Sequence, residues 1–169
     1  MLNKQQFMLG TTAVHGNEPP TSGSNLAPHE QIYSLLNDYA HTLDSGRIED
    51  CAALFADADF AIEGVATVHG KEGVADLFSV IILYQDGTPR TKHLISNVEI
   101  AIGHNGKTAR AVSYLTVMQQ VDAHPLQPIF SGLYADEFVL RAGLWAFTSR
   151  KVSNALFGDM SLHLTAPPI

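Results

Sequence analysis

The spacing of hydrophobic residues changes once along this chain, near residue 90, and that change constrains the fold more than any motif does. Before it, apolar residues recur every three or four positions, the spacing that lines one face of a helix. After it, apolar and polar residues mostly alternate, as in strands with one buried face. Three helices followed by long antiparallel strands predict an α+β fold, with the helices covering one face of a strongly curved sheet.

The first half of the chain carries clear helix boundaries. Pro28 suits a first helical turn, where its missing N–H costs nothing, and Gly46 suits the left-handed cap that ends a helix. The elements expected in this half are helices over 28–44, 47–55 and 70–82 and short strands over 57–63 and 65–69.

The second half predicts four strands. Asn105-Gly106 is the turn signal of a tight hairpin between the first two of them. Strict alternation along the first strand would place His93, Ile95, Asn97 and Glu99 on one face of the sheet. The expected strands cover 91–102, 108–121, 128–140 and 144–152.

The expected organisation is one domain with two flanking segments. Residues 1–27 include a stretch of turn-forming and helix-breaking residues and are predicted to be a flexible arm. The domain is expected over 28–155, followed by a C-terminal tail over 156–169. There is no signal-peptide core and no apolar run of membrane-spanning length, so a cytoplasmic location is expected.

Composition limits the partners of this protein. Hydrophobic residues make up 46% of the chain and charged residues only 16%, below the usual quarter. Much of the surface must then be neutral or buried between copies, so we expect a homodimer or a homotrimer. Ten Lys and Arg oppose 17 Asp and Glu, for a net charge of −7. Without a basic run, nucleic acid and anionic membranes are poor partners.

His93 is the histidine, among eight, that we single out as a candidate general base. It lies at the start of a predicted strand, and imidazole is the side chain best suited to move protons near neutral pH. From spacing alone, the favoured interpretation is a half-exposed histidine at a strand end. Surface positions are expected for His41, His69, His104 and His124.

Asp44 is the candidate partner of that histidine. It ends the first predicted helix, where the negative end of the helix dipole disfavours a carboxylate. A solvated residue that supports the following turn is one interpretation. The other is a dyad, in which the carboxylate accepts the ring N–H of His93, selects its tautomer and leaves the second nitrogen as a general base.

Other kinds of chemistry find little support in the sequence. No Gly-rich phosphate loop and no Gly-x-Ser-x-Gly motif is present. Cys51 is the single cysteine, so it excludes an internal disulfide and a cysteine-based zinc site, and its position on a helix favours packing. The sequence has no His-x-His or His-x-x-x-His spacing that would indicate a metal site. No cofactor and no metal is expected.

Three groups of segments resemble a known family: 39–46 with 54–58; 60–64 with 69–74 and 92–97; and 132–138 with 143–150. Their order and spacing resemble the SnoaL-like branch of the nuclear-transport-factor-2-like superfamily, over about 28–155. Within that branch the chain is similar to scytalone dehydratase and to hexachlorocyclohexane dehydrochlorinase.

The resemblance implies a cone-shaped fold, in which a curved, mostly antiparallel mixed sheet wraps around three N-terminal helices and leaves an apolar pocket at its wide end. It also implies that Asp44 and His93 form the catalytic pair, because both enzymes place such a pair at matching positions. Arg150 matches a pocket arginine of the dehydrochlorinase. The residues expected to bind substrate are Tyr39, Met118, Tyr134 and Arg150.

The chain also departs from both enzymes. Tyr39 stands where the dehydrochlorinase has a pocket lysine, and Leu43 where scytalone dehydratase has a tyrosine. The segment 115–119 lacks the second pocket histidine of scytalone dehydratase. Neither substrate is therefore carried over to this chain.

We expect a cofactor-independent lyase or isomerase acting on a small apolar, cyclic molecule, by dehydration, dehydrohalogenation or a proton shift. Two alternatives remain open. One is a non-catalytic assembly module like the small subunit of a ring-hydroxylating dioxygenase. The other is a binding protein for small hydrophobic molecules. Burial of the Asp44–His93 pair beside a cavity would favour an enzyme over an assembly module.

Overall fold

The computed structural model describes residues 26–122 and 124–166, so all but the last two residues of the expected arm over 1–27 lie outside it. Three helices precede or interrupt the strands: α1 (Pro28–Asp44), α2 (Ile48–Ala53) and α3 (Gly70–Phe78). The strands are β1 (Asp59–Ile62), β2 (Ala66–His69), β3 (Thr91–Ile102), β4 (Thr108–Gln119), β5 (Gln127–Arg141) and β6 (Leu144–Phe157).

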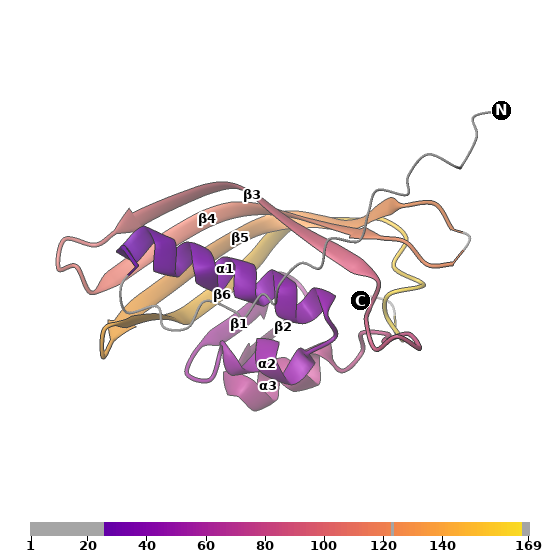
Figure 1. The fold of residues 1–169 in the computed structure, drawn as a ribbon, viewed down its shortest axis with the longest axis horizontal. Helices are drawn as coiled ribbons and strands as arrows, with labels where there is room; N and C mark the ends of the chain where they lie inside the picture. Colours follow the sequence, from indigo (N-terminus) through magenta and orange to yellow (C-terminus); the bar gives the residue numbers. More distant parts are fainter. Residues whose placement is uncertain (1–25, 123, 167–169) are drawn as a thin grey trace, which may run out of the picture.

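The six strands of the described ranges form one mixed sheet in the order β2-β1-β6-β5-β4-β3. Only β1 and β6 pair in parallel; the other neighbours are antiparallel. The sheet stays open, with β2 and β3 at its edges. In Figure 1, α1 lies across the curved face of the long strands, and α2 and α3 lie together beside β1 and β2. The α+β prediction is confirmed.

The boundaries of α1 place Asp44 at the edge of the sheet. Pro28 is the first helical residue, and the backbone N–H of Ala27 donates to the Glu30 carboxylate at 2.8 Å. The apolar stripe faces the core, and Gly46 follows the helix with φ of +70°. A side chain at Gly46 would collide with the carbonyl oxygen of Gly87. The left-handed turn therefore allows the loop before β3 to pass directly against the end of α1.

Strand β3 changes face in its middle, which corrects the strict alternation expected for it. His93 and Ile95 are partly buried, but the pairing with β4 shifts register between Ser96 and Glu99. Asn97 at this bulge has φ of +52°. Because the bulge adds one residue, the strand turns its other side inward beyond it. The inward positions there are Val98, Ile100 and Ile102.

The C-terminal end packs on the domain, where the sequence predicted a strand to 152 and a tail over 156–169. Strand β6 continues to Phe157. Residues 158–166, the C-terminal segment, then return across the sheet end. Leu164 forms a β-bridge with Ile81, and the Thr165 N–H donates to the carbonyl oxygen of Val80 at 2.8 Å.

The structure does not test the predicted oligomeric state or the predicted cellular location. Large apolar side chains are exposed on the strands, including Leu94 on β3 and Val112 and Tyr114 on β4. The homodimer or homotrimer stays a prediction. None of the helices in the described ranges combines the length and the apolar character needed to span a bilayer. The cytoplasmic location likewise stays a prediction.

Candidate active site

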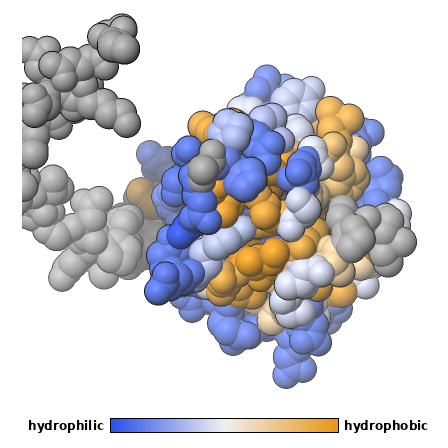
Figure 2. All heavy atoms as spheres, turned by 90° about the vertical axis from the view of Figure 1, so that its right-hand side faces the viewer, coloured by the Kyte–Doolittle hydropathy of each residue, from blue (hydrophilic) through white to orange (hydrophobic). Residues whose placement is uncertain are grey.

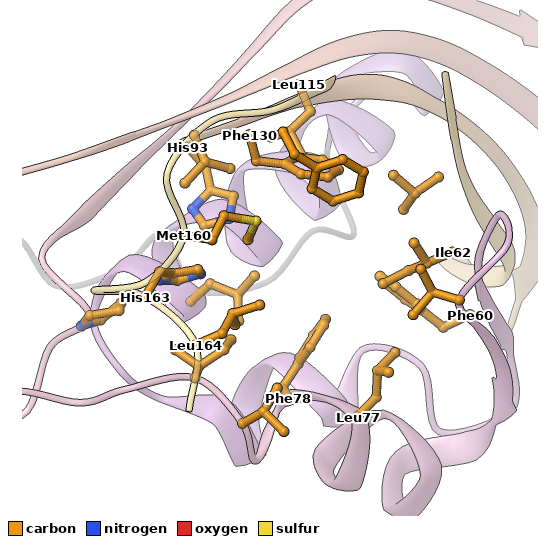
Figure 3. Close-up of a pocket in the computed structure, with 18 of the residues that line it drawn as sticks. Phe60, Ile62, Leu77, Phe78, His93, Leu115, Phe130, Met160, His163 and Leu164 are labelled. Carbon is orange, nitrogen blue, oxygen red and sulfur yellow. The ribbon is translucent and has the colours of Figure 1, made fainter. Parts of the chain in front are cut away.

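A cavity of about 420 Å³ lies between the sheet, the helices and the C-terminal segment. Figure 2 faces this end of the molecule and shows apolar side chains gathered between polar ones. Aliphatic and aromatic side chains from every layer line most of the wall. Its other members, which carry ionisable groups, are Tyr39, Asp76, His93, Tyr134 and His163. In Figure 3, His93, Met160 and His163 lie at one end of the cavity, and Phe60 and Ile62 at the other.

Asp44 and His93 meet at the wall of this cavity, although 49 positions separate them. Oδ1 of Asp44 lies 2.6 Å from Nδ1 of His93, and Oδ2 accepts the backbone N–H of His93 at 2.9 Å. The Thr91 hydroxyl donates to Oδ1 at 2.8 Å. Their side chains are only 10% and 8% exposed. The structure therefore brings the two expected residues together, while their catalytic role stays a prediction.

These contacts explain how a carboxylate is kept at the negative end of α1. Burial alone would raise the pKa of Asp44, but the hydrogen bonds and charge of His93, together with the Thr91 hydroxyl, hold that pKa below its usual value. Asp44 is therefore ionised at neutral pH and can only accept hydrogen bonds. The proton between the two side chains then belongs to Nδ1 of His93.

The orientation of His93 leaves one nitrogen for a ligand. Its Nδ1 is taken by Asp44, and the imidazole lines the cavity, whereas Asp44 lies behind it, outside the lining. With the proton on Nδ1, the lone pair of Nε2 is available as a base. If that nitrogen takes a proton, the adjacent carboxylate stabilises the imidazolium that results.

Tyr39 and Tyr134 line the cavity, as expected for two of the substrate-binding residues. The Tyr134 hydroxyl donates to that of Tyr39 at 3.3 Å, and the Tyr39 ring meets His93 edge-on at 6.1 Å between centroids. Burial raises the pKa of both phenols. Both hydroxyls therefore stay protonated, and the pair forms a rigid aromatic wall beside the base.

Arg150 does not line the cavity, which corrects its expected place in the pocket. Its side chain is 0% exposed, and its Nε and Nη2 donate to the two carboxylate oxygens of Asp136, each at 2.7 Å. The guanidinium carbon lies 4.2 Å from the Tyr39 ring centre and 4.0 Å from that of Tyr134. Arg150 therefore supports these two rings from within the core.

Met118 is also outside the cavity lining, in contrast to its expected role. Alternation along β4 explains the difference, because Leu115 and Val117 are buried and line the cavity while Met118 and its partner Lys92 belong to the other face. The sequence prediction selected the correct strand but the wrong face.

His163 is a lining histidine that sequence reasoning missed. It lies on the C-terminal segment, is 7% exposed and faces the end of the cavity that holds His93. Its setting, Ser161-Leu162-His163-Leu164, has no spacing that marks a site. The only available signal is a histidine in an apolar stretch close to the C-terminus.

The four histidines expected at the surface lie there. His41, His69, His104 and His124 are exposed. Within 26–122 and 124–166, no three His, Cys, Asp or Glu side chains converge in a way that could hold a metal ion. Chemistry without a metal or cofactor stays a prediction. Buried Cys51 has its pKa raised to about 12 by desolvation, so it stays a thiol.

A family model described as a SnoaL-like domain matches residues 24–151. Among solved structures, LinA, a hexachlorocyclohexane dehydrochlorinase, has a TM-score of 0.63 at 22% identity, over 85% of this chain and 97% of that one. A candidate scytalone dehydratase from Novosphingobium aromaticivorans has a TM-score of 0.62 at 21% identity, over 80% of this chain and 91% of that one.

An NTF2-like protein with a cystatin-like fold, also from Novosphingobium aromaticivorans, has a TM-score of 0.62 at 22% identity, over 73% of this chain and 79% of that one. Similarity at this level of identity shows a shared fold. No curated protein matches the chain at a significant level.

Proposed function

This chain belongs to the SnoaL-like domain family, and from that premise we propose that it is a lyase or isomerase whose general base is the Asp44–His93 pair. The observation that carries the proposal is the position of His93, which lines an apolar cavity while Asp44 holds its Nδ1 from behind. The substrate is a small, largely apolar, cyclic molecule, and the chemistry needs no cofactor.

In the proposed reaction, Nε2 of His93 takes a proton from a carbon atom next to an activating or leaving group. The electrons of the broken C–H bond then form a carbon–carbon double bond in one of three ways. A halide departs as an anion, a hydroxyl group takes the proton from the imidazolium and departs as water, or an existing double bond shifts and its far carbon takes that proton. Asp44 stabilises the imidazolium throughout. A mostly apolar wall excludes water and strengthens the few polar contacts inside it.

Two alternatives predict different behaviour. An assembly module would have a filled interior, and a cavity of about 420 Å³ beside the pair favours a small-molecule ligand instead. A carrier of hydrophobic molecules would use the same cavity but would release its ligand unchanged. Turnover therefore separates the carrier from the enzyme.

The test is turnover of a panel of cyclic alcohols, cyclic enones and chlorinated cyclohexanes by wild-type protein, Asp44→Asn and His93→Ala. Loss of a positioned general base is expected to lower kcat/KM by about 10²- to 10⁴-fold. His104→Ala, on an exposed turn, is the matched control and should retain full activity. A loss of less than about tenfold in both dyad variants, or binding without turnover by the wild-type protein, would overturn the proposal.

A further inference from the structure

We infer that His163 is a further substrate-binding residue, whose imidazole hydrogen-bonds a carbonyl or hydroxyl oxygen on the ring compound that His93 deprotonates. The inference rests on the proposed function and narrows it, because it requires an oxygen atom on the substrate. It assigns a role in the site to the C-terminal segment.

The first support is an imidazole in the cavity wall that has an unpaired nitrogen. The side chain of His163 is part of the cavity wall, only 7% exposed, and within the described ranges its Nδ1 is buried without a hydrogen-bond partner. Buried polar atoms in native proteins are nearly always hydrogen-bonded, and exceptions call for an explanation. A rotation of the ring by 180° exchanges the positions of Nδ1 and Cδ2, and a ligand oxygen in the cavity can then supply the missing hydrogen bond.

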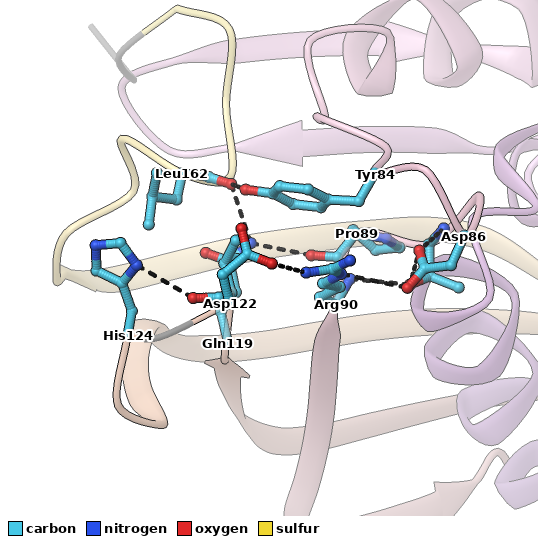
Figure 4. Close-up of polar contacts among 10 residues, drawn as sticks. Tyr84, Asp86, Pro89, Arg90, Gln119, Asp122, His124 and Leu162 are labelled. Atoms are coloured by element: carbon cyan, nitrogen blue, oxygen red, sulfur yellow. Dashed lines mark hydrogen bonds and ion pairs between the residues drawn. The ribbon is translucent and has the colours of Figure 1, made fainter.

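The second support is that the backbone, not the ring, holds His163 in place. Its N–H donates to the carbonyl oxygen of Met160 at 2.9 Å, and its carbonyl oxygen accepts the Ile82 N–H at 2.8 Å. The preceding carbonyl, of Leu162, accepts the Tyr84 hydroxyl at 2.6 Å and Nε2 of Gln119 at 3.2 Å (Figure 4). These bonds fix the backbone from which the His163 side chain starts and use neither ring nitrogen, as preorganised binding requires.

The third support is the electrostatic setting. Burial, reinforced by the charge of His93 and partly offset by that of Asp44, lowers the pKa of His163 to about 4. Asp76 also lines the cavity, and the phenols of Tyr39 and Tyr134 are neutral. His163 is therefore uncharged at neutral pH, when its ring has one N–H donor and one acceptor nitrogen.

A neutral imidazole suits an uncharged oxygen at this position. It adds no positive charge beside the imidazolium that forms on His93. Its N–H can donate to a carbonyl oxygen and stabilise the negative charge that develops there when the neighbouring carbon loses its proton. Its acceptor nitrogen can instead accept a hydroxyl proton. Carbon-bound chlorine donates nothing and accepts weakly, so the site discriminates against a purely chlorinated ring.

The test uses three probes of nearly the same shape: 1-indanone, 1-indanol and indane. Dissociation constants are measured by titration calorimetry for the wild-type protein, His163→Leu and the exposed-turn control His104→Leu. If His163 forms a hydrogen bond with the oxygen atom of a probe, wild-type protein should bind at least one oxygenated probe about tenfold more tightly than indane. The ketone and the alcohol distinguish the carbonyl from the hydroxyl.

In His163→Leu that preference should fall to about twofold, through weaker binding of the oxygenated probe and with indane affinity unchanged. Because His163→Leu could disturb folding, ring ¹⁵N chemical shifts of the wild-type protein give a second measurement. The His163 signals should move with the oxygenated probe and not with indane.

The outcomes separate the two proposals. If the wild-type protein binds all three probes equally, or if His163→Leu keeps the preference, this inference is overturned while the proposed function stands. If none of the probes binds, this inference is overturned, and the proposed function is decided by the turnover test. Turnover could be lost in Asp44→Asn and His93→Ala while His163→Leu keeps the wild-type probe preference. That result would support the proposed function and contradict the role of His163.

Discussion

Two buried carboxylate–base pairs in the described part of the chain, Asp44–His93 and Asp136–Arg150, differ in what surrounds the base. Both have a charge-assisted geometry, with donor–acceptor distances of 2.6 Å and 2.7 Å. His93 lines a cavity and keeps one ring nitrogen free of the carboxylate. Arg150 is covered by aromatic rings and is 0% exposed.

This difference in exposure distinguishes the candidate catalytic pair, Asp44–His93, from the structural pair, Asp136–Arg150. In the covered pair, Asp136 holds the charge of Arg150 in the core and keeps its pKa above the usual value despite burial. The pair cannot reach a ligand, but it backs the two tyrosine rings of the cavity wall. In the open pair, the carboxylate orients a base that a ligand can touch. Burial of opposite charges therefore does not by itself indicate function.

The largest expected effect comes from breaking the covered pair. Asp136→Asn leaves the Arg150 charge buried without a counter-charge, and the free energy of unfolding should fall by about 3–5 kcal/mol. Urea denaturation measures this loss. The double variant Asp136→Leu/Arg150→Met removes both charges and should recover most of the stability, since apolar replacements of whole buried pairs are often neutral. A single-variant loss below about 1 kcal/mol would contradict the comparison.

The open site should respond to acid. Because folding lowers the pKa of His163 from 6.5 to about 4, the unfolded chain binds more protons in this window. Stability is therefore fully present above about pH 6.5 and is lost as the pH falls toward 4, by roughly 3 kcal/mol. The lowered pKa of Asp44 acts in the same direction but below its unfolded value of 3.8.

Urea midpoints of wild-type protein and His163→Leu at pH 7 and pH 4.5 measure this effect. His163→Leu should lose less stability between the two pH values than wild-type protein, and the His104→Leu control should behave like wild type. Equal pH dependence in all three proteins would show that His163 is not held neutral by folding.

The smallest expected effect concerns the hydroxyl that supports the open pair. Thr91→Val removes the donor to Oδ1 of Asp44 and should lower the free energy of unfolding by about 1 kcal/mol. It should also raise the pKa of Asp44 and reduce kcat/KM several-fold without abolishing it. Thr116→Val, on the other side of the sheet, is the control for kcat/KM. Wild-type kinetics in Thr91→Val would mean that the two bonds from His93 suffice to hold Asp44.

Much of the secondary structure could be predicted because it depends on neighbours in sequence. The stripe of α1, its Pro28 start and the Gly46 turn are local features, and the range of β3 is as predicted. Strict alternation of residues gave the wrong buried face for β3 after Ser96, because a bulge adds one residue to the strand. Met118 shows the same problem: its strand was predicted, but its face was not.

The candidate site was only partly predictable. Asp44 and His93 were paired through a family resemblance, and no local pattern joins residues 49 positions apart. Arg150 was expected in the pocket through the same resemblance, and it lies on the strand next to that of Tyr134. Only the packing of the aromatic rings decided that the arginine lies behind the wall.

By itself, the sequence determined the α+β order, the helix that ends at Asp44 and the strand that begins beside His93, because hydrogen bonding and side-chain periodicity in these elements act over a few residues. The tertiary structure decided which polar groups share the cavity. It closed the cavity with the C-terminal segment, whose Leu162 carbonyl accepts the hydroxyl of Tyr84, 78 positions away. His163 enters the site through contacts of this kind, which arise from packing between distant segments and leave no periodic trace along the chain.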